Sequence, residues 1–393
     1  MHRMKALPVR RLSAIISTVD RELRETFGLT NLAIGGASAP ALLDHLYSGN
    51  ALRMRDFDLI AVADREVDEQ LARSIGQALD SPDFRFFPKY VYPRLRSRGE
   101  DELSVAGWGL IWDAHGVEVD LSIFHDEYAL ALNGLMNVDR ILIPMRESMT
   151  LNEIAASMLT VASAEDAVEF GLIDDPCGGY SSWVHHSPAI VAWNAIHASP
   201  IECAIRIIRA CTNKLHLHHL HAELADPLRA AIVQGHDRGD RFLRVRNLVK
   251  LLHDDRAGAE LEMLHALGAF AHWVPEIGEV IERLGHGALI ALLHEADREG
   301  KRDAEHHAAF AAVGEQGGTE ISALRLEALL LKMPPENRDR VLDEVALAEP
   351  MFATLVRGQL PHVQRRAPHP PRPRRVGART STRTARRTLP SIS

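Results

Sequence analysis

An alternation of acidic and apolar side chains in residues 55–62 constrains the fold of this chain most strongly. Asp56 and Asp58 are separated by Phe57, and Leu59 continues the alternation. Because side chains two residues apart on a β-strand point to the same face, the pattern predicts a strand that projects both carboxylates on one side. Phe57 and Leu59 are then expected to face the core.

A second acidic strand is predicted at residues 116–124, where Glu118 and Asp120 alternate with apolar side chains. As a neighbour of the first strand, it would bring Asp120 to the aspartate pair. Hard oxygen donors of this kind suit Mg²⁺, which keeps some waters and binds through a few carboxylates and substrate phosphates. Two such ions, roughly 3.5–4 Å apart, can stabilise both the attacking and the leaving oxygen of an in-line displacement. We therefore expect Asp56, Asp58 and Asp120 to be metal ligands and catalytic residues.

A glycine turn precedes the aspartate pair. Residues 32–34 predict a strand that runs into Gly35 and Gly36, and a helix is expected over residues 40–47. The amides of such a turn and of the helix N-terminus attract phosphate oxygens, and Ser38 adds a hydroxyl donor. The sequence therefore predicts that Gly35, Gly36 and Ser38 hold a triphosphate. Each motif alone is weak, but their order and spacing together favour metal-dependent nucleotidyl transfer.

The remaining hydrophobic pattern predicts a head that mixes strands and helices and a body that is helical. Apolar residues at helical spacing indicate a helix over residues 12–27. Further strands are expected at 85–87, at 90–92 and at 109–112, the last joined by a turn to the second acidic strand as a hairpin. After residue 146 the pattern is helical almost throughout, with breaks expected at residues 226–227, 285–287, 314–318 and 334–335. The expected fold class is α+β, with a mixed-sheet head followed by an all-α neck and body.

Composition places the chain among ordinary globular proteins. Hydrophobic residues make up 46% and charged residues 25% of 393 positions, enough for two or three domains. No apolar run approaches the roughly 20 residues that span a bilayer, so we expect no membrane partner and a cytoplasmic protein. Cys177, Cys203 and Cys211 show no metal-ligand spacing, and no disulfide is expected.

The charge is unevenly distributed, because residues 361–393 carry nine arginines and no acidic residue. The whole chain has a formal net charge of −8, which leaves −17 on residues 1–360. The arginine-rich segment also contains several prolines and is expected to be disordered. It either holds RNA phosphates by counterion release or is a solvated tail without a binding role. The acidic remainder restricts any RNA contact to a local basic groove.

These motifs, in this order, resemble those of the bacterial-type CCA-adding enzymes and poly(A) polymerases, a family of the polymerase-β-like nucleotidyltransferase superfamily. Gly35-Gly36-Ala37 resembles the family's G-G-x-V-R-D, Asp56-Phe57-Asp58 its D-x-D, and the strand of Asp120 that of its third acid. The resemblance runs from about Asn31 to Glu276. Six further segments resemble motifs of the family. Residues 127–128 resemble its trailing E-x-Y, residues 146–152 its R-R-D-F-T-I-N, and residues 172–179 its I-D-P-x-G-G turn. Residues 202–210 resemble its E-D-x-x-R-x-x-R-A helix, residues 241–252 its neck helices, and residues 273–276 its closing P-E.

The resemblance implies further nucleotide-binding residues. They are Arg146 and Asn152 in the counterpart of R-R-D-F-T-I-N, and Glu202, Arg206 and Arg209 in the counterpart of E-D-x-x-R-x-x-R-A. It also implies Mg²⁺ as the cofactor and a nucleoside triphosphate as the substrate, ATP first and CTP as a further candidate. The implied partner is RNA, first of all tRNA.

Three departures from the family's pattern bear on specificity. Residues 38–40 read Ser-Ala-Pro where the family has V-R-D, and residues 147–148 read Glu-Ser after Arg146 where the family has R-D. Cys203 replaces the Asp that reads the incoming base in the family, together with the motif's Arg, here Arg206. Since a thiol is a poor acceptor without fixed charge, the choice between C and A stays open.

The sequence therefore predicts a divergent, Mg²⁺-dependent nucleotidyltransferase that adds nucleotides to an RNA 3′ end, first of all that of a tRNA. Two alternatives remain, namely the same transfer to a protein or small-molecule acceptor, and a catalytically inactive RNA-binding remnant. We expect a nucleotidyltransferase head at residues 1–145 and a helical neck with a nucleotide-facing helix at residues 146–225. An all-α RNA-binding body is expected at residues 226–360, followed by a disordered basic tail at residues 361–393.

Overall fold

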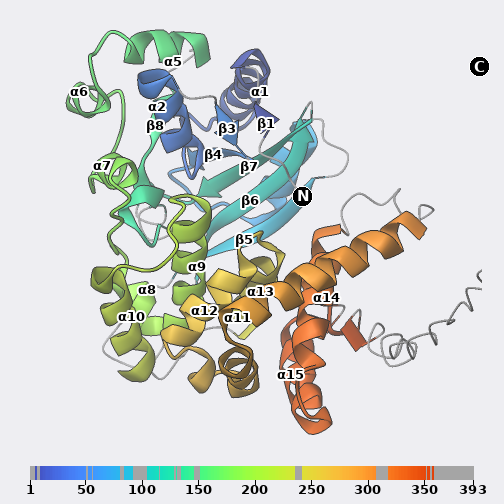
Figure 1. The fold of residues 1–393 in the computed structure, drawn as a ribbon. Helices are drawn as coiled ribbons and strands as arrows, with labels where there is room; N and C mark the ends of the chain where they lie inside the picture. Colours follow the sequence, from blue (N-terminus) through green and yellow to red (C-terminus); the bar gives the residue numbers. More distant parts are fainter. Residues whose placement is uncertain are drawn as a thin grey trace, which may run out of the picture.

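A sheet-containing head and a helical body make up the protein, with the sheet in the upper part of Figure 1 and the body below it. The computed structural model describes residues 5–6, 9–49, 52–54, 56–79, 84–91, 104–114, 116–127, 130, 134–145, 151–234, 241–306, 317–350, 352–354 and 356–357. Within these ranges, none of the helices combines the length and the apolarity that crossing a bilayer requires.

The strands belong to two sheets. They are β1 (Lys5–Ala6), β2 (Asn31–Ile34), β3 (Arg53–Met54), β4 (Phe57–Val62), β5 (Arg85–Val91), β6 (Ser104–Ala114), β7 (Val117–Phe124) and β8 (Ile143–Met145). β1 and β3 form a small antiparallel pair, and the others form one mixed sheet in the order β5-β6-β7-β4-β2-β8. β4 and β7 are parallel, whereas all other neighbours in this sheet are antiparallel.

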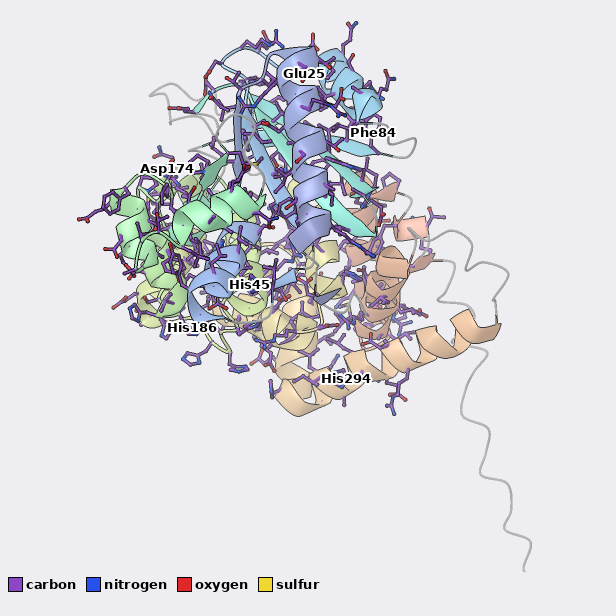
Figure 2. All side chains as sticks on the ribbon, turned by 90° about the horizontal axis from the view of Figure 1, so that it is seen from above. Glu25, His45, Phe84, Asp174, His186 and His294 are labelled. Atoms are coloured by element: carbon purple, nitrogen blue, oxygen red, sulfur yellow. The ribbon has the colours of Figure 1, made fainter. Side chains whose placement is uncertain are left out.

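Helices pack around the sheet and form the body. Those of the first half are α1 (Val9–Arg21), α2 (Ser38–Ser48), α3 (Glu69–Ala78), α5 (Leu151–Met158), α6 (Ala164–Glu169), α7 (Gly179–Val184) and α8 (Trp193–Ala198). Those of the second half are α9 (Pro200–Asn213), α10 (Ala222–Gln234), α11 (Arg241–His253), α12 (Ala257–Ala266), α13 (Pro275–His306), α14 (Gly317–Leu330) and α15 (Pro335–Ala348). A π-helix η1 (Glu22–Thr26) continues α1, and the short 3₁₀ helices are η2 (Asn137–Arg140) and η3 (Phe270–His272). Figure 2 looks onto α1 in front of the sheet, with Glu25 near its end and His294 in the body on the opposite side.

The structure confirms the expected α+β class and both acidic strands. Phe57 and Leu59 on β4 are fully buried, as the alternation predicted. β6 and β7 form the predicted hairpin, in which Ala114 pairs with Val117. The two strand segments expected at 85–87 and 90–92 belong to a single strand, β5, with an irregular register between Lys89 and Tyr90.

Two large hydrophobic cores underlie the head and the body, beside a small cluster of Ile60, Ala106 and Phe124. The head core joins α1, the sheet and the buried faces of α2 and α3, and it extends to Ile154 on α5, Ala167 on α6 and Tyr180 on α7. The body core joins α8 through α15, including the buried isoleucines of α9. Helices α5–α7 of the predicted neck therefore pack with the head, whereas α8 and α9 pack with the body.

One expected helix break is wrong. Residues 226–227 do not separate two helices, because Pro227 lies inside α10. Proline removes one backbone hydrogen bond from a helix interior. Here the helix continues because Leu224, Leu228 and Ile232 lie on one face at helical spacing and are buried in the body core. The break expected at 285–287 is present as a kink at Gly285, which has a φ of 70°, and α15 begins at the predicted proline pair.

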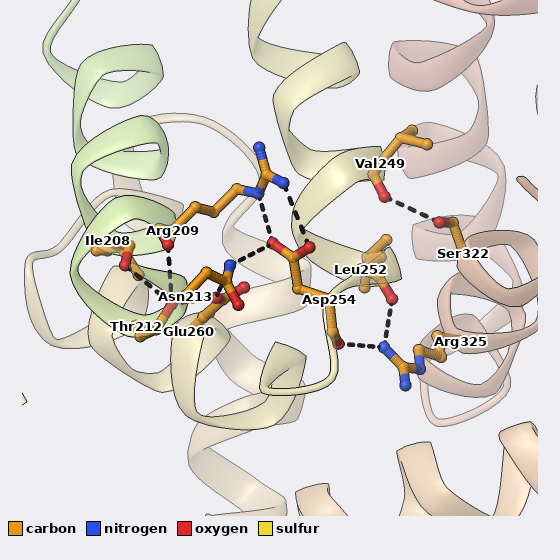
Figure 3. Close-up of polar contacts among 10 residues, drawn as sticks. All are labelled: Ile208, Arg209, Thr212, Asn213, Val249, Leu252, Asp254, Glu260, Ser322 and Arg325. Atoms are coloured by element: carbon orange, nitrogen blue, oxygen red, sulfur yellow. Dashed lines mark hydrogen bonds and ion pairs between the residues drawn. The ribbon is translucent and has the colours of Figure 1, made fainter. Parts of the chain in front are cut away.

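A buried polar network joins α9 to the helices of the body (Figure 3). Asp254 accepts hydrogen bonds from Arg209 Nε at 2.6 Å and from Asn213 Nδ2 at 3.0 Å. Glu260 is fully buried and accepts hydrogen bonds from Thr212 Oγ1 and, at 3.2 Å, from Asn213 Nδ2. Its second oxygen, Oε2, has no hydrogen-bond partner among the described residues. Burial, reinforced by the charge of Asp254, raises the pKa of Glu260 to about 7.

We expect Glu260→Gln to remove a pH-dependent loss of stability. The folded state holds a proton on Glu260 up to about pH 7, whereas the unfolded chain releases it near the usual 4.5. Stability is therefore lost as pH rises through this window. A glutamine keeps the acceptor oxygen and carries no charge. The free energy of unfolding of the variant, relative to the original protein, should increase by about 1–3 kcal/mol between pH 4.5 and pH 8 in urea titrations. A difference that stays constant over this range would contradict the assignment.

Candidate active site

The pairing of β4 with β7 places two of the predicted metal ligands side by side. The strands run parallel, and Asp58 is directly opposite Asp120 in their register. Asp56 lies one residue before the first residue of β4, and all three aspartates are partly exposed. The charges of Asp56 and Asp120 both act on Asp58. The structure therefore gathers the three predicted carboxylates in one neighbourhood.

The predicted glycine turn touches the same aspartate. Gly36 has a φ of +55°, and a Cβ at this position would collide with the Asp58 carboxylate. The Ala37 N–H donates to Asp58 Oδ2 at 2.8 Å, which places this carboxylate at the N-terminus of α2. The same carboxylate therefore benefits from the helix dipole. A Cβ on Gly35 would meet Cδ1 at the end of the Ile60 side chain, so the turn lies close to β4 at this position as well.

Ser38 connects the turn to the D-x-D segment. It is fully buried, and its Oγ accepts a hydrogen bond from the Asp58 N–H at 2.8 Å and donates to the Asp56 carbonyl at 3.3 Å. The hydroxyl therefore helps to position both aspartates. Its predicted bond to a triphosphate stays a prediction.

The environment of Asp58 disfavours its charge. Burial raises the pKa of Asp58 to about 7, and repulsion by Asp56 and Asp120 adds to this rise. The positive charge of Lys214 and the hydrogen bond from Ala37 act in the opposite direction. A cation placed beside Asp58 would therefore stabilise the charged form of its carboxylate.

Two lysines that the sequence analysis did not single out lie next to the carboxylates. Lys89 on β5 places Nζ 3.6 Å from Asp120 Oδ1, an atom that has no hydrogen-bond partner among the described residues. Lys214, just after α9, binds Asp139 at 3.0 Å and also interacts with the charge of Asp58. Burial lowers the pKa of Lys214, but these two carboxylates outweigh it and raise the pKa above its ordinary value. No motif marks either lysine, because each is a single cation whose partner comes from a distant segment.

The helix α9 carries the residues predicted to bind the nucleotide. Glu202 is only 2% exposed and accepts hydrogen bonds from Arg206 Nη1 at 3.5 Å and from Asn247 Nδ2 at 3.3 Å. Arg206 is partly exposed, and its charge also acts on Asp139. Cys203 is fully buried in the body core, with Sγ 3.9 Å from Glu202 Oε2. Of these residues, only Arg206 combines a charge with access to solvent.

The other predicted nucleotide-binding residues lie in different surroundings. Arg209 holds Asp254 with two hydrogen bonds, of 2.6 and 3.3 Å, in the buried network of Figure 3. Asn152 is exposed on α5, a helix that packs against α1. Arg146 lies outside the described residues. The assignment of these three residues to nucleotide binding stays a prediction.

The donor chemistry of the carboxylates fits Mg²⁺. Asp56, Asp58 and Asp120 offer only hard oxygen atoms, and Asp120 Oδ1 is a buried acceptor without a hydrogen bond. Within the described part of the chain, no three His, Cys, Asp or Glu side chains converge closely enough to form a ready metal site. The predicted magnesium ligands therefore stay a prediction, supported by residue chemistry and by strand register.

Comparisons with known proteins concern the fold. No family model and no curated protein sequence matches the chain. The structure of a CCA-adding enzyme in apo form I is similar with a TM-score of 0.50 and 12% identity, covering 92% of this chain and 71% of that one. A tRNA-processing enzyme in apo form I gives 0.49 and 12%, covering 92% and 82%. A tRNA nucleotidyltransferase complexed with a primer tRNA and an incoming ATP analog gives 0.49 and 12%, covering 89% and 87%.

We expect Gly36→Ala to destabilise the protein more than Gly49→Ala. Both glycines have a positive φ, of +55° and +69°, but an added Cβ meets the Asp58 carboxylate only at Gly36 and open space at Gly49. Gly49→Ala is the control and should lower the free energy of unfolding by about 1 kcal/mol, from backbone strain alone. Gly36→Ala should lower it by about 3 kcal/mol, because the clash with Asp58 is added to the strain. Urea unfolding of the two variants measures the difference. Equal losses would show that the turn and Asp58 are not in the described contact.

Proposed function

We propose that this protein is a Mg²⁺-dependent nucleotidyltransferase that adds nucleotides to an RNA 3′ end, with tRNA as the first candidate acceptor. The observation that carries the proposal is the register of β4 with β7, which sets Asp58 opposite Asp120 beside the glycine turn. This arrangement brings Asp58 and Asp120 together beside a helix N-terminus, and transfer of a nucleotidyl group from a triphosphate uses carboxylates and anion-binding amides of this kind.

The roles of the residues follow from their positions. Asp56 and Asp58 would hold magnesium, and Asp120 would position the attacking 3′-hydroxyl. Magnesium, when bound, neutralises charge on the phosphates and on the departing pyrophosphate. Gly35 and Gly36 allow the triphosphate to approach the backbone at the start of α2. Catalysis then comes from positioning and from charge stabilisation rather than from a covalent intermediate.

The fold supports this proposal at the level of architecture. A CCA-adding enzyme shares the arrangement of a sheet head and a helical body over 92% of this chain. Fold alone does not fix an activity, so the tRNA acceptor and the use of ATP or CTP are taken from the resemblance of the motifs. Together they point to a divergent relative of these enzymes.

Nucleotide choice is expected to be relaxed. Arg206 is held by Glu202 on α9, and it provides donors for a base or a phosphate. Cys203, at the position of the family's base-reading Asp, is buried and offers no strong acceptor. We therefore assign nucleotide contact on this helix to Arg206 and expect weak discrimination between ATP and CTP.

A second candidate function, the inactive RNA-binding remnant, is favoured by one observation. Lys89 and Lys214 place positive charge next to the aspartates, so the acidic cluster is partly neutralised without a metal ion. Transfer to a protein or small molecule is the third candidate. One experiment distinguishes the three candidates. The protein is incubated with labelled triphosphates and a cell extract, and RNA, protein and small molecules are then separated. Label in the RNA supports the proposed function, label in protein or small molecules supports the third candidate, and no label supports the inactive remnant.

We expect Asp58→Asn and Asp120→Asn each to reduce Mg²⁺-dependent incorporation of label from ATP or CTP into tRNA by at least about 100-fold. This expectation rests on the loss of a group that holds the metal or the attacking hydroxyl, which should cost no less than loss of an outer-shell partner. The rate of incorporation into tRNA transcripts, with and without EDTA, provides the measurement.

Glu118→Gln is the matched control. Glu118 lies on the same face of β7 as Asp120, but its carboxylate binds Arg85 at 3.1 Å in an exposed ion pair. Its replacement should leave the rate within about twofold, since exposed pairs contribute little. If the original protein labels no RNA, protein or small molecule, or if Asp58→Asn labels as well as the original, the proposed transfer is wrong.

A further inference from the structure

Positively charged side chains from three elements gather beside the Asp120 side of the candidate active site. Lys250 on α11 is exposed to solvent, although many protein atoms surround its side chain. This enclosure lowers the pKa of Lys250 to about 7, and repulsion from Arg246, Arg209, Lys89 and Arg206 adds to the effect. The cluster therefore combines cations of β5, α9 and α11.

Most of these cations already have carboxylate partners. Arg206 and Arg209 on α9 bind Glu202 and Asp254, respectively. Lys89 lies 3.6 Å from Asp120, a distance longer than a hydrogen bond. Among the residues that the structure describes, Lys250 forms no ion pair and no hydrogen bond. Its amino group thus lies near other cations and has no carboxylate partner within the described part of the chain.

The aromatic ring of Phe87 brings two of the cations together. Lys89 Nζ lies 4.8 Å and Arg246 Cζ lies 5.2 Å from the centre of this ring. Both contacts are within the range of a cation–π interaction, which orients the charges without neutralising them. Arg246 and Lys250 are four residues apart on α11 and therefore share one helix face.

A glycine on the intervening strand allows Lys89 to reach the active site. β6 lies between β5 and β7, and a Cβ on Gly109 would be 2.6 Å from Phe87 Cζ and 2.7 Å from Lys89 Cε. Both side chains therefore cross β6 over a position that has no side chain. This close packing holds Lys89 between Asp120 and the cations of α11.

We propose that Lys89, Arg246 and Lys250 form a binding site for substrate phosphate groups, adjacent to the three aspartates. The inference rests on the proposed function, because it takes the phosphates to belong to that reaction. Phosphate oxygens would supply the negative charge that Lys250 lacks among the described residues, and Lys89, 3.6 Å from Asp120, joins this site to the carboxylates. Two sources share this chemistry, the triphosphate chain of the nucleotide and the sugar-phosphate backbone of the acceptor RNA.

Binding measurements without metal test this site. The full-length protein is titrated in EDTA at pH 6.5 with inorganic tripolyphosphate by calorimetry, and with a fluorescent 12-nucleotide single-stranded RNA by anisotropy. Lys250→Gln removes the charge, and Lys250→Arg retains it. Lys332→Gln is the control, because Lys332 is an exposed lysine in the turn after α14, outside the cluster. Urea unfolding verifies that the variants fold.

We expect Lys250→Gln to weaken the binding of at least one probe about tenfold, while Lys250→Arg stays within about threefold of the original and Lys332→Gln is unchanged. Weakened binding of tripolyphosphate alone assigns the site to the nucleotide. Weakened binding of RNA alone, with a salt dependence reduced by about 0.7 in log–log slope, assigns it to the acceptor backbone. Loss for both probes indicates a site that both substrates share.

Unchanged binding of both probes by Lys250→Gln would overturn the proposed phosphate site. Equal losses for Lys250→Gln and Lys332→Gln would overturn it as well, because they would reflect total charge rather than a local site. Neither result would affect the proposed transfer reaction, which is measured separately by magnesium-dependent labelling. Failure of labelling together with a tenfold loss of binding would instead leave a phosphate site in a protein with another activity.

Discussion

The parallel pairing of β4 with β7 is the constraint on which the candidate active site depends. A tight turn cannot join parallel neighbours, so the chain passes through α3 and the β5–β6 pair before it returns as β7. This detour places Lys89 on the outer side of β7, while β2 and the glycine turn lie on the other side of β4. A shift of one residue in the β4–β7 register would turn Asp120 to the opposite face of the sheet.

Electrostatic balance is the second feature that organises the site. Burial raises the pKa of Asp58 most, and repulsion from Asp56 and Asp120 raises it further. Lysines offset part of this repulsion from two directions, Lys89 from the sheet and Lys214 from the end of α9. Lys214 follows a helix of the body core, so the body contributes charge to a site whose carboxylates belong to the head.

Local patterns in the sequence predicted the head well and the charge partners poorly. The alternation around Asp58 and Asp120 was sufficient to predict both strands, because period two is a local property. The continuation of α10 through Pro227 was missed, since burial of one helix face outweighed a local signal for a break. Lys89 and Lys214 were also missed, because their carboxylate partners come from segments distant in the chain. Asp254 is the clearest case, as its bonds to Arg209 and Asn213 exist only after the body helices have packed.

Arg325 on α14 has a mechanical consequence. Its guanidinium binds Asp297 on α13 through two bonds of 2.8 Å, and it also donates to the carbonyls of Leu252 and Asp254 at the end of α11, both at 2.6 Å. One side chain thus clamps three helices, and the clamp is enclosed by protein, since Arg325 is only 4% exposed. These helices are therefore tied to one another at this contact. A change in the position of the head relative to these helices would therefore be accommodated by segments outside this contact.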